Sequence, residues 1–469
     1  MQKSITNALI CILLIILLSA CSNSFNDLFS GYNQQMLAVK NAQLQGNFPQ
    51  AINLIPTRNS YDGTYNLALL EKARLEYLAN NSKQSQQDFE QVYQHIQQAS
   101  QAAQVELSRG VENVAAIMSN DSATRYDIPS YEQSMLHSYQ ALNYLTQQDL
   151  SGALVEVRRA NLVQENALKA NLNAIYQQQD KTASKQLSSQ YPTMNNAIGS
   201  VKNGFQNAYT FYLSALLYEA AEQRNSAYID YKKALEIYPD NSYLQQSVWR
   251  LAVYLQMSSD IALYRKSMPK TITTAMRNKN LGQLSIIVEN GIVAPKQENS
   301  LNLPIYTGHN DLRFYSVALP SYPNHLTTYS PLQLTYEGKV YQSEEIVRLQ
   351  SLAAKQLHDK LPKIVTRQIA RLVAKEEIRK QMARKGGDVG NIFASLYNIA
   401  TERADTRSWS TLPDSIHILR LDLSAGDHQL TLNINGTNQV INVSIKPNRQ
   451  TLVKLNAIGP HIKFNTLNL

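Results

Sequence analysis

The apolar residues of this chain follow two different spacings, and the change between them divides the chain into a helical part and a strand-rich part. Between Phe25 and Leu263, apolar positions recur every three or four residues, the spacing of one helix face. From about Thr271 onward, short apolar runs alternate with turn signals. This pattern predicts an α + β multidomain protein, in which a helical array precedes a mainly antiparallel, sandwich-like β domain with an inserted helical block.

Small and aromatic residues recur in the helical part at the spacing of the 34-residue tetratricopeptide repeat (TPR). In such repeats, small side chains let two antiparallel helices cross closely, and aromatic side chains fill the space between hairpins. Residues 61–265 therefore read as a TPR-like domain, with an irregular helical bundle as the alternative. The predicted packing positions are Ala141, Tyr144, Ala153, Ala160, Ala215, Tyr218, Ala227, Tyr231, Ala234 and Pro239.

The repeat pattern is interrupted after Ala160. Residues 161–206 contain a polar helical stretch followed by a stretch rich in Gln, Ser and Asn. An insertion in a helical array lies on one face, often the binding face, but a surface loop is the simpler interpretation. We expect residues 161–206 to form a polar insertion within the TPR-like domain.

Strand signals fall in two regions, residues 266–342 and 404–469. In the first region, Leu284–Val288 is a strand candidate, and Glu289–Gly291 resembles the turn that follows it. In the second, four apolar runs are separated by Gly, Asn, Asp and Pro residues typical of turns. Because the middle two runs alternate apolar with polar residues, we expect a C-terminal antiparallel meander with one solvated face, half of a small sandwich.

A basic amphipathic helical insertion is expected between the two β regions, over residues 343–403. Val365, Ile369 and Leu372 share one face of it. Such a helix can lie on an anionic membrane, but a solvated outer face on a helix packed against the sheet is the interpretation we favour. The candidate contacts to an anionic surface are Lys363, Arg367, Arg371, Lys375, Arg379 and Lys380.

The first 20 residues have the anatomy of a secretory signal peptide, with a cation at Lys3, an apolar core and small residues before Cys21. A transmembrane anchor does not fit, because the apolar stretch from Ala8 to Ala20 has 13 residues and a spanning helix needs about 20. Leu18-Ser-Ala-Cys21 resembles the lipobox of bacterial lipoproteins. The resemblance implies that residues 1–20 are removed and that Cys21 carries a diacylglyceryl thioether and an acylated amino terminus, with chains such as palmitate.

A lipid on Cys21 would hold the membrane-proximal residues 21–60, which also contain a first weak repeat, at a bilayer. In lipoproteins of bacteria with two membranes, Asp after the lipidated cysteine signals retention in the inner membrane, whereas here the residue is Ser22. The resemblance therefore favours the outer membrane, with the chain facing the periplasm.

Export changes what the composition implies. The chain has 44 basic and 36 acidic residues, a formal charge of +8, which in the cytoplasm would indicate nucleic acid as a partner. In the cell envelope we expect no nucleic acid, but anionic head groups, lipopolysaccharide or acidic proteins. With Cys11 in the removed signal and Cys21 lipidated, the mature chain offers no thiol for a disulfide, a thiolate metal site or a nucleophile.

Sequence motifs for catalysis are absent, with one partial exception. The chain has no Gly-Lys-Ser/Thr phosphate loop, His-Glu-x-x-His or Gly-x-Ser-x-Gly, and its eight histidines are scattered without metal-ligand spacing. Ser267-Met-Pro-Lys270 has the Ser-x-x-Lys form of acyl-enzymes, but Pro269 conflicts with the helix start which that motif needs. We expect no enzyme activity, catalytic residue, metal or cofactor, and keep a serine hydrolase at Ser267 and Lys270 as the weakest alternative.

The most compact polar cluster is Asp405-Thr-Arg407-Ser-Trp409. Asp405 and Arg407 can pair across an extended turn while Trp409 enters the core. We interpret this cluster as a structural clasp in preference to a binding site.

Four segments resemble an uncharacterised family of bacterial TPR-containing lipoproteins: Leu154–Ala160, Val288–Pro295, Leu319–Tyr322 and Ala404–Trp409. The similarity extends over nearly the whole mature chain. It implies a lipobox signal, helical repeats and a C-terminal β domain, and it transfers no catalytic residue.

These features predict a non-enzymatic scaffold or assembly factor of the cell envelope, which holds a protein partner on the concave face of its TPR-like repeats. The alternative function is binding of an anionic envelope glycan or lipid through the β domain and the basic helix.

Overall fold

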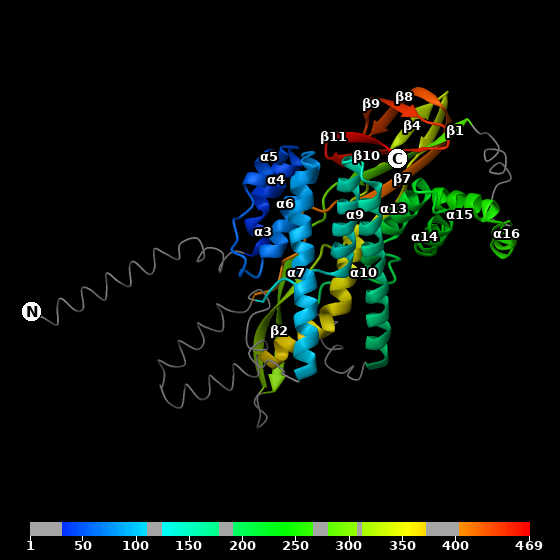
Figure 1. Ribbon diagram of the computed structural model, residues 1–469. Helices are drawn as coiled ribbons and strands as arrows, with labels where there is room; N and C mark the ends of the chain where they lie inside the picture. Colours follow the sequence, from blue (N-terminus) through cyan, green and yellow to red (C-terminus); the bar gives the residue numbers. More distant parts are fainter. Residues whose placement is uncertain (1–30, 110–123, 178–190, 266–279, 307–311, 372–402) are drawn as a thin grey trace, which may run out of the picture.

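The protein combines a helical array with two β-sheets and a hairpin (Figure 1), as the α + β prediction requires. The computed structural model describes residues 31–109, 124–177, 191–265, 280–306, 312–371 and 403–469. Cys21 and the predicted signal lie outside the described residues. No helix in these ranges is long and apolar enough to cross a membrane.

The helical array is built from antiparallel hairpins, of which α6–α7, α9–α10 and α13–α14 make the closest helix pairs. The two segments that fit the repeat best fold as α9–α10 and α13–α14. The helices are α3 (Tyr32–Gln35), α4 (Leu37–Leu44), α5 (Phe48–Asn53), α6 (Tyr65–Leu78), α7 (Ser82–Arg109), α9 (Ser130–Thr146), α10 (Leu150–Gln177), α12 (Asn195–Ile198), α13 (Ala208–Ala220), α14 (Arg224–Ile237), α15 (Ser242–Tyr254) and α16 (Ser258–Tyr264).

The turns between these helices repeat one backbone feature with the period of the repeat. Gly46, Asn80, Gln148, Glu222 and Gln256 each have a positive φ, between 57° and 68°, which ends the preceding helix in a left-handed residue. Gly46 and Asn80 are 34 residues apart, as are Glu222 and Gln256. The 34-residue period seen in the side chains is therefore also a period of the backbone.

Small residues mark the helix crossings. The alanines predicted as packing positions, Ala141, Ala153, Ala160, Ala215, Ala227 and Ala234, are all 0% exposed, as is Tyr231, whereas Pro239 lies at the surface. At Gly152 an added Cβ would lie 2.4 Å from Cδ1 of Tyr144. Because no side chain larger than hydrogen fits at Gly152, α10 approaches α9 closely beside Tyr144.

The expected polar helical stretch after Ala160 is the second half of α10, which continues without a break to Gln177. Asn161 and Gln164 within it are buried in contacts between helices, whereas Glu165, Asn166 and Lys169 are exposed, and residues 178–190 lie outside the described residues. Asn161 Nδ2 donates to Oδ2 of Asp230 (2.7 Å), and Gln164 Nε2 donates to the hydroxyl of Thr210 (2.5 Å). The apolar period breaks there because α10 meets α13 and α14 through paired polar groups.

Two sheets and one hairpin make up the β part. The five-stranded sheet has the order β11-β10-β1-β7-β6, the four-stranded sheet the order β5-β4-β8-β9, and β2 pairs with β3. The strands are β1 (Leu281–Asn290), β2 (Gln297–Tyr306), β3 (Leu312–Ser321), β4 (Gln333–Tyr336), β5 (Lys339–Gln342), β6 (Glu344–Arg348), β7 (Ser415–Ser424), β8 (Gly426–Ile434), β9 (Thr437–Ile445), β10 (Gln450–Ile458) and β11 (His461–Asn468).

The four predicted C-terminal runs are strands, but they do not form a meander. Only β8 and β9 pair with each other, while β7 and β10 lie in the other sheet on either side of β1, with β10 parallel to it. The regions 266–342 and 404–469 are therefore not separate units. The physical reason is that β7, β1 and β10 are buried on both faces over most of their length, which suits the middle of a covered sheet and not a half-solvated meander.

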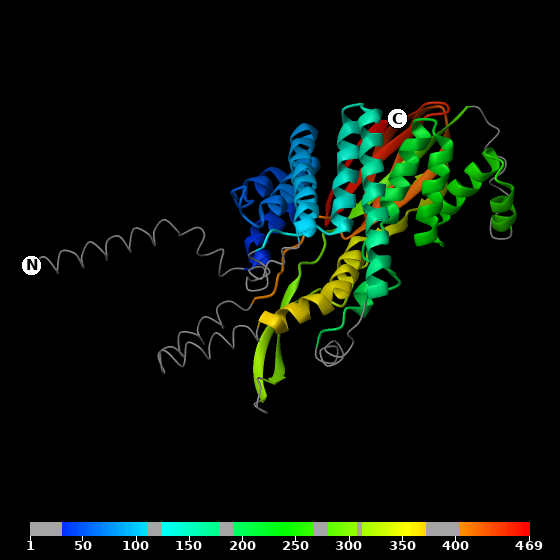
Figure 2. The ribbon, with the colours of Figure 1, turned by 60° about the horizontal axis from the view of Figure 1, so that its bottom comes forward.

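The protein is layered, with helices on one face of the five-stranded sheet and the four-stranded sheet on its other face (Figure 2). Leu430, Leu432, Ile441 and Val443 of the second sheet are buried in the same hydrophobic cluster as the core of the helical array. The opposite face of β8 and β9 is largely exposed. Because one core runs through all three layers, the array and the sheets fold as parts of one body.

The basic helix begins at residue 349, because residues 344–348 form the edge strand β6. It is described as far as residue 371. Val365 is buried against Val317 and Leu319 of β3, so the apolar side of the helix packs on the β2–β3 hairpin. Lys363 is exposed and Arg367 half-buried, but Arg371 is 1% exposed. Because Arg371 is buried, it cannot be one of the candidate contacts to an anionic surface. Lys375, Arg379 and Lys380 lie outside the described residues.

Buried ion pairs join the helices to the five-stranded sheet. Arg74 of α6 bonds Glu289 of β1 at 2.5 Å, and Tyr139 of α9 donates to the other oxygen of Glu289 at 2.9 Å. The guanidinium of Arg74 also lies 4.4 Å from the centre of the Tyr139 ring. Nearby, burial lowers the pKa of Lys454 on β10 to about 8, partly offset by Glu289.

A second such cluster lies on β7. Arg420 bonds Glu219 of α13 at 3.2 Å and the hydroxyls of Tyr231 and Ser247 at 3.0 Å each. Arg250 of α15 completes the cluster at 2.5 Å from Glu219. Despite its burial, Glu219 has a pKa lowered to about 2 by Arg250 and Arg420. The sheet and the array are thus joined by ion pairs that are largely buried, although Glu219 and Arg250 also line a cavity of about 240 Å³.

Glu289→Gln should destabilise the protein by about 3–5 kcal/mol, because it leaves the charge of Arg74 buried without a counter-ion. The exposed pair of Lys233 and Glu165 gives the control, Glu165→Gln, which should cost under about 1 kcal/mol. Urea unfolding of both variants measures the two costs. A Glu289→Gln variant as stable as the control would contradict the importance of this ion pair.

Candidate functional site

The face of the helical array that turns toward the sheet is occupied by the chain's own segment 408–412. Glu71 of α6 accepts hydrogen bonds from the backbone N–H groups of Ser410 (2.7 Å) and Thr411 (2.8 Å). Glu132 of α9 accepts one from the N–H of Trp409 at 3.1 Å. Helices α6 and α9 of the array therefore bind a turn of their own chain on the face that meets the sheet.

The clasp predicted over 405–409 is confirmed. Arg407 donates to both carboxylate oxygens of Asp405, at 2.9 and 2.8 Å, and to the backbone carbonyl of Thr124 at 2.7 Å. Trp409 is 1% exposed and packs edge-on against Phe89 and Tyr139. The clasp fixes the segment that fills the array.

Burial gives the two acceptor carboxyls raised pKa values. The pKa of Glu132 is raised to about 7 by burial, against the lowering effect of its hydrogen bonds, and the pKa of Glu71 is also raised. These groups are fully engaged with Tyr126, Tyr131, Tyr32 and the 409–411 backbone. We interpret their shifts as a consequence of structural burial, since both carboxyls are 0% exposed.

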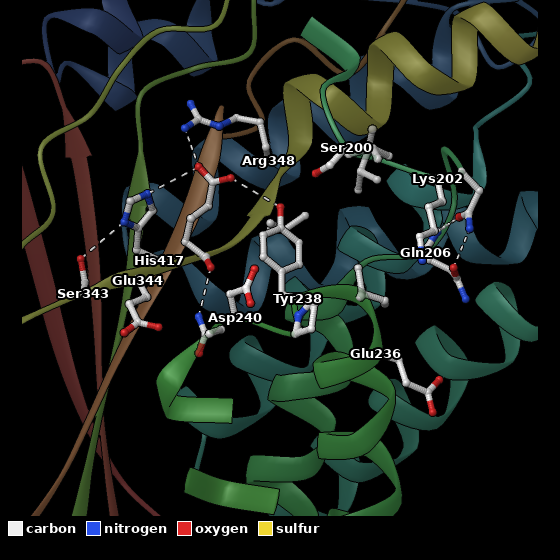
Figure 3. Close-up of a pocket in the computed structure, with 18 of the residues that line it drawn as sticks. Ser200, Lys202, Gln206, Glu236, Tyr238, Asp240, Ser343, Glu344, Arg348 and His417 are labelled. Carbon is white, nitrogen blue, oxygen red and sulfur yellow. Dashed lines mark hydrogen bonds and ion pairs between the residues drawn. The ribbon is translucent and has the colours of Figure 1, made fainter. Parts of the chain in front are cut away.

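A cavity of about 830 Å³ lies where the helical array ends against the sheet. Its walls come from three parts of the chain: the loop 200–206, the end of α14 with the turn into α15, and β6 with the neighbouring strand β7 (Figure 3). Figure 3 shows Lys202 and Glu236 on one side of it and His417 on the other. The cavity is thus built by the junction of array and sheet.

The sheet side of this cavity is organised around Glu345. Its carboxylate bonds Arg348 at 2.5 Å, and the hydroxyl of Tyr238 lies 3.5 Å from its other oxygen. Its backbone carbonyl accepts from Asn241 Nδ2 at 3.1 Å. The adjacent Glu344 accepts from the backbone N–H of Ser242 at 2.6 Å, capping the first turn of α15. The two glutamates thereby attach the edge strand to the last helices.

Ser343, His417 and Glu345 lie in a row that resembles a catalytic triad, but the geometry does not fit one. The hydroxyl of Ser343 is 3.5 Å from Nδ1 of His417, and Nε2 of His417 is 3.9 Å from Glu345. Ser343 is 3% exposed and accepts a hydrogen bond from the N–H of Leu332 at 2.9 Å. Burial, and Arg348 nearby, lower the pKa of His417 to about 4, too low for an effective general base.

Acidic side chains predominate around the cavity. The described residues that line it include Glu236, Asp240, Glu344 and Glu345 against the cations Lys202 and Arg348. Glu236 and Asp240 are exposed on the helical side, whereas the other two carboxylates are engaged in the contacts above. Ile237, Tyr238, Pro239 and Pro331 supply apolar surface beside them. The lining suits a ligand with both apolar and basic groups.

Sequence reasoning missed this cavity. Its residues come from separate segments between Ser200 and His417, and apart from Pro239, a predicted repeat position, none belongs to a motif that the sequence analysis singled out. Glu344 and Glu345 fell within the expected helical block, so their place on an edge strand was not predicted. Ser267 and Lys270 lie outside the described residues, and within the described ranges no group of three His, Cys, Asp or Glu could hold a metal ion.

Comparison with known proteins adds little. No family model and no curated protein matches the sequence. Among solved structures, the crystal structure of MamA protein is similar, with 12% identity and a TM-score of 0.28, over 50% of this chain and 87% of that one. At this TM-score the similarity supports no conclusion about fold or function.

The stability of the wild-type protein should fall more steeply with acidification than that of His417→Gln. Because the pKa of His417 in the folded protein, about 4, lies below the unfolded value of 6.5, its contribution is complete above pH 6.5 and is lost as the pH falls toward 4. At pH 4.5 this loss amounts to about 2–3 kcal/mol relative to pH 7.

Urea unfolding of both proteins at pH 7 and pH 4.5 measures the difference. Asp414, which has a pKa raised to about 6 by burial, is present in both and cancels. Equal losses in the two proteins would show that His417 is not held neutral by burial.

Proposed function

We propose that this protein is a non-enzymatic interaction protein of the cell envelope, anchored in the outer membrane by lipid on Cys21 and facing the periplasm. Its partner is a protein whose segment enters the cavity at the junction of the array and the sheet. The observation that carries this proposal is the occupied inner face of the array. A partner cannot use that face unless it displaces buried, hydrogen-bonded backbone.

The cavity has the size and chemistry for such a partner. Its volume of about 830 Å³ falls within the range of specific ligand sites, about 300–1,000 Å³. Glu236 and Asp240 offer carboxylates at its helical side, and Tyr238 and Pro239 offer apolar contact between them. A partner segment with an apolar side chain next to Lys or Arg complements this lining.

The double variant Glu236→Lys/Asp240→Lys should lose the partner, because it replaces the two exposed carboxylates with like charges. With a photo-crosslinking residue at Pro239 in living cells, we expect a defined crosslinked band in the wild type and at least a 10-fold weaker band in this variant. The control is Glu222→Lys/Asp427→Lys, which makes the same charge change at exposed positions outside the cavity lining.

Crosslinks that survive in the Glu236→Lys/Asp240→Lys variant would contradict a partner in this cavity. Equal loss in the control variant would do so as well, since it would reduce the effect to overall charge.

The anchor is tested separately with Cys21→Ser, which removes the sulfur that would carry the lipid. We expect the wild type to incorporate radiolabelled fatty acid and to sediment with outer membranes, whereas the variant takes up no label. The free energy of unfolding should be the same in the variant and the wild type, because Cys21 precedes the first described residue. Label in the Cys21→Ser protein would rule out lipidation at this cysteine.

A further inference from the structure

A second, smaller cavity lies at the side of the molecule where the clasp meets the basic helix. It has a volume of about 210 Å³ and is lined by residues 124–129, Lys296, Pro320, the middle of the 349–371 helix, and Asp405 with Arg407. Unlike the junction cavity, it brings together positive charge from four separate parts of the chain.

Six basic and two acidic side chains are among the described residues that line it. The cations are Arg125, Lys296, Lys360, Lys363, Arg367 and Arg407, and the anions are Asp127 and Asp405. The acidic groups already have partners, since Asp405 is paired with Arg407 and Asp127 lies 3.0 Å from Lys360. The lining therefore retains a clear positive excess.

The cations that line the cavity differ in exposure. Lys296 is half-buried and donates to the backbone carbonyl of Arg407 at 2.7 Å, and burial lowers its pKa. Arg125, Lys360 and Lys363 are exposed, and Arg367 is half-buried. An entering anion thus meets exposed cations beside the half-buried Lys296 and Arg367, where partial desolvation makes its attraction to charge stronger than in water.

The start of the described chain places this cavity near the proposed anchor. Asn33 Nδ2 donates to the backbone carbonyl of Lys296, and a Cβ added at Gly31 would lie 3.5 Å from Oγ1 of Thr406, between the two clasp residues of the cavity. Gly31 follows Cys21 by ten positions, and that length of chain spans at most about 35 Å.

We propose that this cavity binds the phosphate group of an anionic membrane lipid, with Arg125 and Lys363 as its accessible contacts. The inference rests on the proposed lipid on Cys21, because the anchor holds the cavity within reach of the head groups. Lys and Arg side chains are the residues that bind phosphate in proteins, and a bilayer surface supplies phosphate at high local concentration. Bound head groups then orient the body against the membrane while the acyl chains hold it there.

The test uses the mature chain without its acyl group, residues 22–469, because acyl chains would themselves bind vesicles. At low salt it should bind vesicles of phosphatidylcholine with phosphatidylglycerol and should not bind phosphatidylcholine alone, and added salt should weaken the binding. Arg125→Gln/Lys363→Gln should lower the affinity about 30-fold, because each cation near an anionic surface contributes about fivefold.

The matched control is Lys339→Gln/Lys446→Gln, two exposed cations at turns of the four-stranded sheet, which should change the affinity less than about threefold. An absence of binding to anionic vesicles, or equal weakening in both double variants, would overturn the proposal. Inorganic phosphate that binds the wild type but not Arg125→Gln/Lys363→Gln, without vesicle binding, would instead identify a soluble anion as the ligand. Each of these failures leaves the fatty-acid labelling of Cys21 and the crosslinks at Pro239 unaffected.

Discussion

The structure depends on charges buried between the helical array and the five-stranded sheet. Arg74 with Glu289, and Arg420 with Glu219, lie where both partners are almost completely shielded from water. A buried charge without its partner costs several kcal/mol, so array and sheet cannot separate without exposing or orphaning these groups. The pairs therefore fix which face of α6 and which face of α13 turns toward the five-stranded sheet.

This constraint changes what a repeat array does in the protein. The sheet-facing side of α6 and α9 is here covered by the turn around residues 409–411, whose N–H groups bond Glu71 and Glu132. Two of the openings that remain where different parts of the chain meet are the acidic cavity beside β6 and the basic cavity beside the clasp. Their opposite charge suits two different ligands, a partner protein at one and a lipid phosphate at the other. The array acts as a frame that creates both sites by folding onto the sheet.

The sequence predicted the features that depend on the spacing of residue types within short segments. The helical hairpins, the Asp405–Arg407 pair, the burial of Trp409 and the four C-terminal strands follow from spacing and turn residues, and the structure confirms them. Strand order did not follow, because the parallel pairing of β1 with β10 joins residues about 170 positions apart. Glu289 is the clearest failure: its neighbours Asn290 and Gly291 favour a turn, yet Glu289 lies within β1 as the partner of Arg74. Ion pairs between distant segments leave no periodic signal, and both cavities are lined by such distant segments.

The central claim is that array and sheet form one cooperative body, and native-state hydrogen exchange tests it most directly. Amides of β1 and β7 should open with the same free energy as those of the sheet-facing helices α6, α9 and α13, because all share one core. Denaturant should expose them together, in a single unit. Exchange of the helical amides at a distinctly lower free energy, with the sheet still protected, would contradict the account, since the inner face of the array would then open to partners without unfolding the sheet.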